Sequence, residues 1–270
     1  MFNKNIILTR VACLGNFTLQ NLKCKNSVIV NHQKNRVDYA LAMHKFPKFK
    51  INLSEIKDLA SSKFVYELFI QEDRDIFNYH KPSLLIMDSF SELTDKMFVN
   101  KVTGSCVLGH WKDIKHTDEF NKLYEYKGLL DISKIKMYYD QFFNQFIKIY
   151  GSIPIIFLNF PTNLDSRKEY KARGGEIASA ILDLSKTKYK NIIPINADLV
   201  EANPNDPAVY HFSDRTYRLL AYKISNLNLK NINYRLPWKL RIKLFLTCFI
   251  PFYNLRRNII NNLWKDVLNV

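Results

Sequence analysis

The chain has 270 residues and a formal net charge of +15, with 47% hydrophobic and 14% aromatic residues. This composition excludes a disordered chain and provides enough apolar side chains for one substantial core. The four cysteines form no CxxC pair, so neither a disulfide framework nor a zinc site is expected, and free thiols in the cytoplasm are the default.

The apolar segments favour neither secretion nor a membrane span. The amino-terminal apolar stretch is too short for the core of a signal peptide and ends at Arg10. No run of residues approaches the roughly 20 apolar positions that a membrane-spanning helix requires.

The first expected element is a buried strand formed by Asn5–Leu8 and Val11–Leu14, which places Cys13 inside the strand. Gly15 ends this strand, and a helix is expected to begin within Phe17–Leu22. A strand, a glycine turn and a helix form the opening unit of a doubly wound α/β domain.

The next segments continue the alternation of strands and helices. Ser27–Asn31 predicts a short strand. Asn52–Phe77 predicts a helix, because apolar residues recur there at spacings of three and four, and Ser54 is its candidate N-cap. The continuous apolar run Leu84–Met87 is typical of a parallel strand that is covered on both faces.

Asp88 and Ser89 follow that strand directly. They would lie at its carboxyl end, where open α/β sheets bind their ligands. A helix cap for Asp88 and a turn position for Ser89 are the favoured alternatives.

The segment Lys101–His116 is expected to be a loop, with Cys106 and His110 four residues apart. A thiol and a base at this spacing are a weak indication of catalysis, and a buried structural cysteine is favoured. The aromatic residues of the following helix, Ile132–Tyr150, recur at helical spacing and are expected in the core.

The strongest strand pattern is Ser152–Asn159, and Asn191–Asn196 predicts the last strand. Asn159 could donate an amide hydrogen to a developing oxyanion. Arg167 and Arg173, which precede or enter the next helix, could bind an anionic group. A solvated surface position is the alternative for each. The alternation as a whole predicts an α/β class with a mainly parallel sheet and helices on both faces.

The rest of the chain is organised around the stretch from Asp206 to Ala221. Prolines keep the approach to His211 extended, and Ser213 or Asp214 is expected to cap the helix that follows. A histidine at a loop-to-helix junction, with a carboxylate to orient it, is what a general base needs. The alternative is a surface histidine at a helix start.

This final block resembles the late Asp-x-x-His block of the SGNH/GDSL hydrolase superfamily, and the resemblance covers roughly residues 5–225. The stretch from Ala12 to Thr18 looks like the first block of a narrower branch, which serves bacterial capsule and surface-polysaccharide biosynthesis. The resemblance implies a three-layer α/β/α fold, with His211 as general base and Asp206 as its partner. It also implies that Gly15 and Asn16 contribute to the oxyanion site.

Two positions depart from the pattern of that branch. Phe17 stands where the branch carries its cysteine nucleophile, which makes Thr18 the nearest hydroxyl and the candidate replacement. Four residues separate Asp206 from His211, where two are usual.

The resemblance implies acyl transfer or deacylation on a capsule, a lipopolysaccharide or a lipid-linked precursor. No cofactor is expected, although an acyl donor such as acetyl-CoA would be a substrate. The alternative is a catalytically inactive protein of the same fold that binds a glycan or a partner.

Residues 230–270 differ in composition from the expected α/β domain, residues 1–229. They carry eight Lys or Arg and one acid, a net of +7. The cationic residues are interleaved with Trp, Phe and Leu in two expected helices, which suits the anionic surface of a membrane. The sequence therefore predicts a cytoplasmic protein bound peripherally to the inner face of the membrane. Packing of these helices on the α/β domain is the alternative, and nucleic acid is an unlikely partner.

Overall fold

The computed structural model describes residues 5–24, 27–50, 57–72, 74–206, 208–227, 229 and 232–234, together with positions 242, 255, 257–259 and 262. The carboxyl-terminal region 230–270 therefore lies almost entirely outside the described residues, and so do the predictions made for it. No helix among the described residues is both long and apolar enough to cross a membrane.

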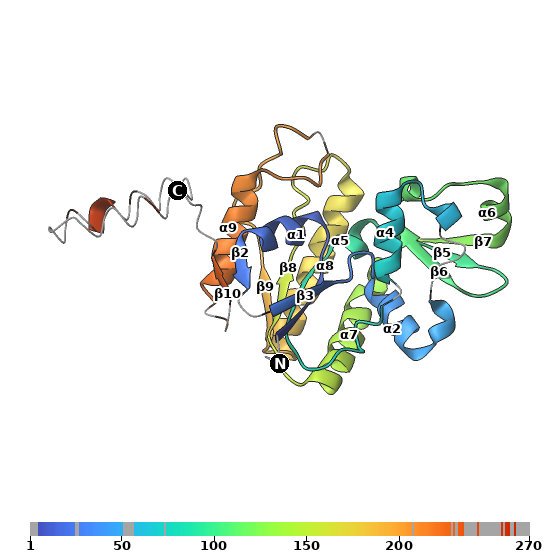
Figure 1. The fold of residues 1–270 in the computed structure, drawn as a ribbon, viewed down its shortest axis with the longest axis horizontal. Helices are drawn as coiled ribbons and strands as arrows, with labels where there is room; N and C mark the ends of the chain where they lie inside the picture. The colour runs from blue at the N-terminus through green and yellow to red at the C-terminus, as the bar shows by residue number, and fades with distance from the viewer. Residues whose placement is uncertain are drawn as a thin grey trace.

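A five-stranded parallel sheet forms the centre of the molecule (Figure 1). Its strands, in spatial order, are β3 (Ser27–Asn31), β1 (Asn5–Arg10), β4 (Pro82–Asp88), β8 (Ile155–Leu158) and β9 (Ile192–Ile195). All four neighbouring pairs run parallel. The central strands are buried on both faces, as their continuous apolar runs indicate. The expected α/β class is confirmed.

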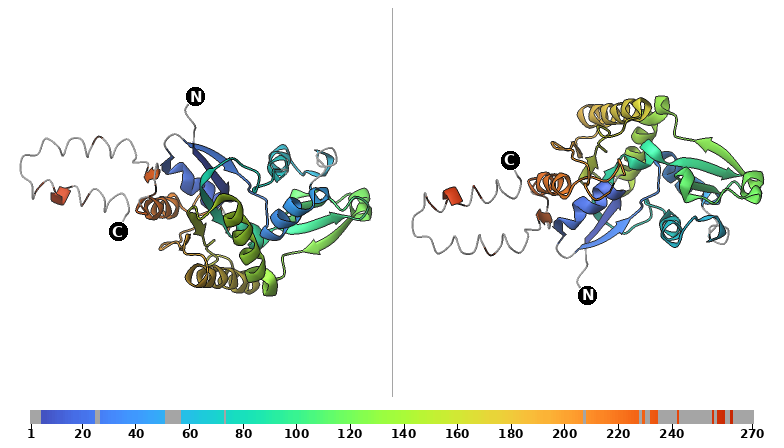
Figure 2. Two further views of the ribbon diagram at one scale, coloured as in Figure 1. Left: turned by 90° about the horizontal axis from the view of Figure 1, so that it is seen from below. Right: turned by 90° about the horizontal axis from the view of Figure 1, so that it is seen from above.

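Helices cover both faces of the sheet (Figure 2). On one face α1 (Cys13–Gln20) packs beside α9 (Asp214–Ser225). On the other face α7 (Ile135–Tyr150) packs against α2 (Val37–Lys45) and α8 (Lys168–Thr187). Tyr139, Phe142, Phe143 and Phe146 of α7 are fully buried, so the predicted core role is confirmed for these four rings, whereas Tyr138 and Tyr150 are only partly buried.

A small antiparallel sheet projects from this body, at the right of Figure 1. It consists of β6 (Cys106–Gly109), β5 (Lys96–Asn100) and β7 (Tyr124–Gly128), in that order, and is called the lobe here. Helices α4 (Lys63–Glu72) and α6 (Asp118–Leu123) contribute Phe69 and Phe120 to the hydrophobic cluster of the lobe.

The lobe is the largest departure from the sequence prediction. The segment expected to be a loop contains β6, which pairs with β5. The three strands of the lobe have four or five residues each, too few to give a clear alternating pattern of apolar and polar residues. The helix expected over Asn52–Phe77 is shorter than predicted, because α4 begins at Lys63, and Ala60 instead pairs with Ile114 in an isolated bridge. The candidate cap Ser54 lies outside the described residues.

The remaining elements are short. They are β2 (Leu22–Cys24), paired antiparallel with β10 (Ile232–Tyr234), the helix α5 (Phe90–Thr94), and the 3-10 turns η1 (Pro47–Phe49), η2 (Trp111–Asp113) and η3 (Ile132–Lys134).

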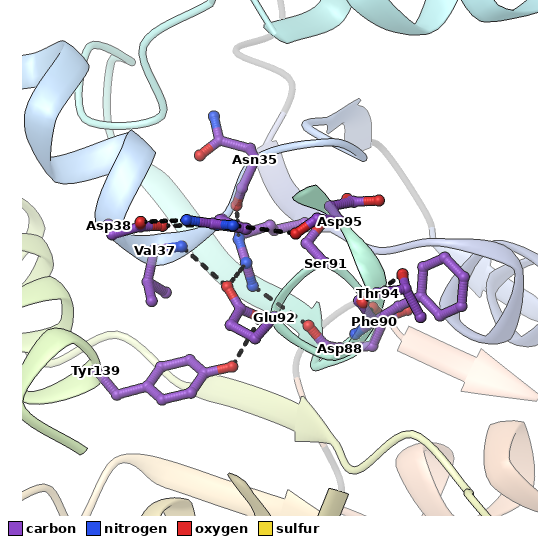
Figure 3. A network of polar contacts seen from close by, with 12 residues as sticks. Asn35, Val37, Asp38, Asp88, Phe90, Ser91, Glu92, Thr94, Asp95 and Tyr139 are labelled. Carbon is purple, nitrogen blue, oxygen red and sulfur yellow. Dashed lines mark hydrogen bonds and ion pairs between the residues drawn. The ribbon is translucent and has the colours of Figure 1, made fainter. Parts of the chain in front are cut away.

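A buried ion pair fixes the end of β1 just before the site. Arg10, the last residue of β1, pairs with Glu92 of α5, and both side chains are fully buried. Glu92 also accepts hydrogen bonds from the backbone N–H of Val37 (2.9 Å) and the hydroxyl of Tyr139 (2.8 Å), as Figure 3 shows. Such partners are needed because a buried carboxylate is costly to desolvate. The network ties β1, α2, α5 and α7 together beneath the carboxyl edge of the sheet.

Candidate active site

Two helix starts meet at the carboxyl edge of the parallel sheet. Cys13 is the first residue of α1, and His211 lies in the loop that precedes α9. Because α1 and α9 lie side by side on one face, the two residues meet although 198 positions separate them in the chain. The distance from His211 Nε2 to Cys13 Sγ is 3.2 Å.

Asp206 completes a line of three groups. Its Oδ2 lies 2.5 Å from His211 Nδ1. Two hydrogen bonds hold Asp206 close to the histidine: Asp206 Oδ1 accepts from the N–H of Ala208, and the carbonyl of Ala208 accepts from the N–H of His211. The N–H of Ala208 and the imidazole of His211 both lower the pKa of Asp206, and the Ala208 N–H is the larger cause. The wider spacing of this block therefore does not prevent the contact.

The contact with Asp206 also defines the imidazole tautomer. A carboxylate at Nδ1 favours a proton on that nitrogen, which leaves Nε2 as the hydrogen-bond acceptor facing Cys13. The thiol of Cys13 can then donate to Nε2.

The thiol of Cys13 is neutral at neutral pH. Burial, and after it the nearby negative charge of Asp88, raise its pKa from the ordinary 9.0 to about 11. A position at a helix N-terminus ordinarily lowers the pKa of a cysteine, but burial is the stronger effect here. The arrangement suits a thiol that is deprotonated by the histidine during attack.

Asp88 holds the first turn of α1 in place beneath Cys13. Its Oδ2 accepts from the N–H of Ala12 (2.8 Å) and of Gly15 (3.4 Å), and its Oδ1 accepts from the N–H of Phe90 (3.1 Å). Burial raises the pKa of Asp88 to about 6, against the lowering effect of these donors. The helix-capping role favoured for Asp88 is what the structure shows, and it extends to two helices.

Thr18 does not reach the site. Its side chain is fully buried, and its hydroxyl donates to the carbonyl of Leu14, one turn back in α1 (2.7 Å). The prediction of Thr18 as the replacement nucleophile is therefore wrong in its geometry. The error follows from the strand boundary: β1 ends at Arg10, so Cys13 begins the helix and faces the imidazole.

The predicted oxyanion residues have different surroundings. The N–H of Gly15 is directed at Asp88, and a β-carbon at Gly15 would lie 2.3 Å from that of Val11, so this glycine serves close packing. Asn16 does line the cleft beside Cys13 and donates to Gln33 Oε1 over a long 3.3 Å. The N–H groups of Cys13 and Leu14, at the start of α1, have no carbonyl partner within the helix.

Asn159 and Arg167 are engaged with other protein groups. Asn159 Nδ2 donates to Asn196 Oδ1 (2.7 Å). Arg167 forms two hydrogen bonds to Asp165, from Nε (2.9 Å) and Nη2 (2.7 Å), and also bonds the hydroxyl of Tyr210. Because Tyr210 immediately precedes His211, Arg167 supports the loop that carries the imidazole. Its predicted role as a substrate-binding residue is not what these contacts indicate.

Arg173 is likewise occupied. It donates to the backbone carbonyls of Glu92 and Leu130.

Phe17 forms an aromatic wall beside the histidine. Its ring meets the imidazole of His211 edge-on at 6.4 Å and lies 5.1 Å from the ring of Tyr217. Phe17 is thus a neighbour of the acid–base pair, and Cys13, four positions earlier, provides the sulfur.

No three His, Cys, Asp or Glu side chains within the described residues converge on a point where they could hold a metal ion. The chemistry available at this site is that of a thiol, an imidazole and a carboxylate in line.

No protein-family model matches the sequence, and no curated protein matches it. Solved structures similar to this chain include a protein described as a GDSL-like lipase from Bacteroides ovatus, with 10% identity and a TM-score of 0.45. They also include a family two carbohydrate esterase from Clostridium thermocellum in complex with cellohexaose (10%, 0.40) and an acetyl xylan esterase from the rumen bacterium Butyrivibrio proteoclasticus (12%, 0.39).

This chain spans less than two thirds of the length of each of these structures. The matches span 87%, 84% and 84% of this chain but only 56%, 64% and 63% of the respective structures.

Proposed function

We propose that this protein is an acyl-transfer enzyme that uses Cys13 as nucleophile, His211 as general base and Asp206 to orient and charge-stabilise the imidazole. The observation that carries the proposal is the line of contacts from Sγ to Nε2 (3.2 Å) and from Nδ1 to Oδ2 (2.5 Å). A nucleophile within hydrogen-bond reach of a base that a third group orients is the geometry of covalent acyl transfer.

The first half-reaction forms a thioester. His211 Nε2 takes the thiol proton as Cys13 Sγ attacks the carbonyl carbon of an acyl ester. Negative charge develops on the carbonyl oxygen, and the donors that would stabilise it are the N–H groups of Cys13 and Leu14 at the start of α1 and the side chain of Asn16. The tetrahedral intermediate then expels the alcohol, which receives its proton from His211, and the acyl group stays on sulfur.

The second half-reaction releases the acyl group. His211 deprotonates water or an acceptor hydroxyl, whose oxygen attacks the thioester carbonyl, and the thiol is regenerated with the proton that the imidazole held. Throughout, the lowered pKa keeps Asp206 ionised near neutral pH, so that its carboxylate offsets the charge of the imidazolium.

The substrate class is an acylated bacterial surface polysaccharide, or its lipid-linked precursor, as the resemblance of the first and last sequence blocks implies. Whether water or a sugar hydroxyl is the acceptor separates deacylation from acyl transfer. The alternative is a catalytically inactive protein of the same fold that binds a glycan or a partner, and such a protein would leave Cys13 unacylated.

Trapping of the acyl-enzyme tests this proposal. Incubation with p-nitrophenyl acetate at pH 8 should add one acetyl group to Cys13, detected by intact-protein and peptide mass spectrometry. Cys13→Ala should abolish that adduct, and His211→Ala should slow its formation about 10²–10⁴-fold. Thr18→Val is the matched control and should acylate normally. Acylation of Cys13 at an unchanged rate in the His211 variant would contradict the assignment of the base.

We also propose that the carboxyl-terminal region 230–270 binds an anionic membrane surface. Its net charge of +7 supports this, since each Lys or Arg near such a surface contributes about 1 kcal/mol. Deletion of residues 230–270 should move the protein from the membrane fraction to the soluble fraction. A full-length protein that is already soluble at low salt would refute it.

A further inference from the structure

A groove with many apolar side chains lies beside Cys13, which is one of the residues that line it. It has a volume of about 530 Å³ and is lined by Cys13, by three amide side chains, and by Phe17, Leu19, Ile29 and Phe64. Pockets that hold ligands of drug size have volumes of roughly 300–1,000 Å³. An acetyl group, with three heavy atoms, would occupy only a small part of this space.

The apolar side chains come from three separate elements and are exposed. Phe17 of α1, Ile29 of β3 and Phe64 of α4 have exposed fractions of 38%, 44% and 65%. Contiguous exposed apolar side chains in a depression mark a binding site more often than a plain surface. Single exposed apolar residues need no such explanation, but three that face one groove do.

The lining also excludes several kinds of ligand. No Asp, Glu, Lys, Arg or His is among the described residues that line the groove. A phosphate or carboxylate would therefore find no cation there, and apart from the three amide side chains and Cys13 the lining is apolar. The groove suits a neutral aliphatic chain.

We propose that this groove holds the acyl chain of the substrate, and that this chain is a medium or long aliphatic chain rather than acetyl. The inference rests on the proposed role of Cys13, because the residue that lines the groove must bring its thiol to the carbonyl carbon to which the chain is attached. The chain then extends over Phe17 and Ile29 toward Phe64, while the alcohol portion of the ester lies on the side of His211, which must protonate it.

A series of p-nitrophenyl esters from acetate (C2) to dodecanoate (C12) tests the inference. The value of kcat/KM for the full-length protein should rise up to about fourfold for each methylene that is buried, and should level off when the groove is full. A profile that is flat, or that is highest for acetate, would overturn the inference.

Two groove variants and one matched control locate the effect. Ile29→Ser and Phe64→Ser should each lower the ratio of kcat/KM for the octanoate ester to that for the acetate ester by about tenfold, the loss expected for an exposed side chain that covers a few methylenes. Val28→Ser is the control, because Val28 is similarly exposed (42%) on β3 but its side chain points to the opposite face. Equal effects at positions 28 and 29 would contradict the placement of the chain.

A binding measurement separates this inference from the proposed function. Cys13→Ala should still bind the methyl ester of cis-parinaric acid, a neutral fluorescent acyl chain, and the double variants Cys13→Ala/Ile29→Ser and Cys13→Ala/Phe64→Ser should bind it several-fold more weakly. If no p-nitrophenyl ester acylates Cys13 but the methyl ester binds in this way, the proposed function fails and the groove assignment holds. If p-nitrophenyl acetate acylates Cys13 and the methyl ester does not bind to Cys13→Ala, the function holds and the acyl-chain inference fails.

Discussion

Among the described residues, Cys13 has a histidine close to it in space and Cys106 has one close to it in sequence, and only the first of these two pairs forms a reactive arrangement. Cys13 and His211 are 198 positions apart and in contact, with 3.2 Å between sulfur and nitrogen. Cys106 and His110 are four positions apart, yet the sulfur of Cys106 faces a hydrophobic cluster with Tyr39 and the imidazole of His110 faces Thr94 at 3.3 Å.

The difference lies in the elements that carry the two pairs. Four positions apart on a helix, two side chains lie on the same face one turn away from each other. Cys106 instead begins the strand β6, and His110 follows its end. Four positions along a strand span about 13 Å, because each residue adds ~3.3 Å. Cys106 and His110 are therefore close in sequence but apart in space. Cys13 and His211 are far apart in sequence, and the two helices that begin at one edge of the sheet bring them together.

The largest difference expected between the two pairs is in ester hydrolysis, when Asp206, the partner of His211, or His110 is replaced. Asp206→Ala should lower kcat/KM for p-nitrophenyl acetate about a hundredfold, at the lower end of the range for acid–base catalysis because Asp206 is partly exposed. His110→Ala, the control in the other pair, should change kcat/KM by less than about threefold, an energy of the size of one surface contact. A loss at His110 as large as that at Asp206 would show that the lobe carries part of the catalytic machinery.

The extent to which the sequence predicted this site depended on how local each signal was. The start of α9 follows from Ser213, whose side chain accepts from the N–H of Thr216, and from apolar residues at helical spacing. The start of α1 depends instead on Asp88, which is 76 positions from Ala12 and caps that helix from a neighbouring strand. No local pattern records such a contact, so the strand was extended through Cys13 and the nucleophile was assigned to Thr18.

A similar reason explains why the lobe was not predicted. The strands of the lobe are stabilised by α4, which lies far from β6 in the sequence. The carboxyl-edge position of His211, by contrast, follows from the order of strands and helices alone, since right-handed crossovers place successive loops at the same edge. The fold class and the histidine were therefore predictable, and the sulfur was not.

The protonation of the two thiols gives a second, smaller difference to measure. Burial raises the pKa of Cys13 to about 11 and that of Cys106 to about 12. At pH 7 about one Cys13 in ten thousand is then a thiolate. Alkylation of Cys13 by iodoacetamide should rise about tenfold for each pH unit from 7 to 10, because the thiolate is the reactive form and its fraction grows with pH below the pKa.

Peptide mass spectrometry can follow each cysteine separately in this experiment. Cys106, with an exposed fraction of 2%, should remain unlabelled until the protein unfolds. A plateau in the labelling of Cys13 near pH 7 would mean that Cys13 and His211 form a thiolate–imidazolium pair in the resting protein. General-base activation during attack would then be the wrong mechanism.

The smallest effects expected are on the free energy of unfolding. For this quantity the substitution of Cys106 should matter more than that of Cys13, whereas for activity the opposite is expected. Cys106 packs in a hydrophobic cluster with Met43 and Leu108. Cys106→Ala should therefore lower the free energy of unfolding by about 1–2 kcal/mol, as removal of a buried side-chain atom from a packed core usually does, and should leave kcat/KM within about twofold. Cys13 is only partly buried beside an open groove, so Cys13→Ala should change stability by less, about 0.5 kcal/mol, while it abolishes turnover. Urea unfolding of the two variants, together with their ester hydrolysis, checks both.

If Cys106→Ala lost activity without losing stability, the packing role of that thiol would be wrong. A large loss of stability in Cys13→Ala would mean that the hydrogen bond to His211 chiefly holds α1 to α9, rather than preparing a nucleophile.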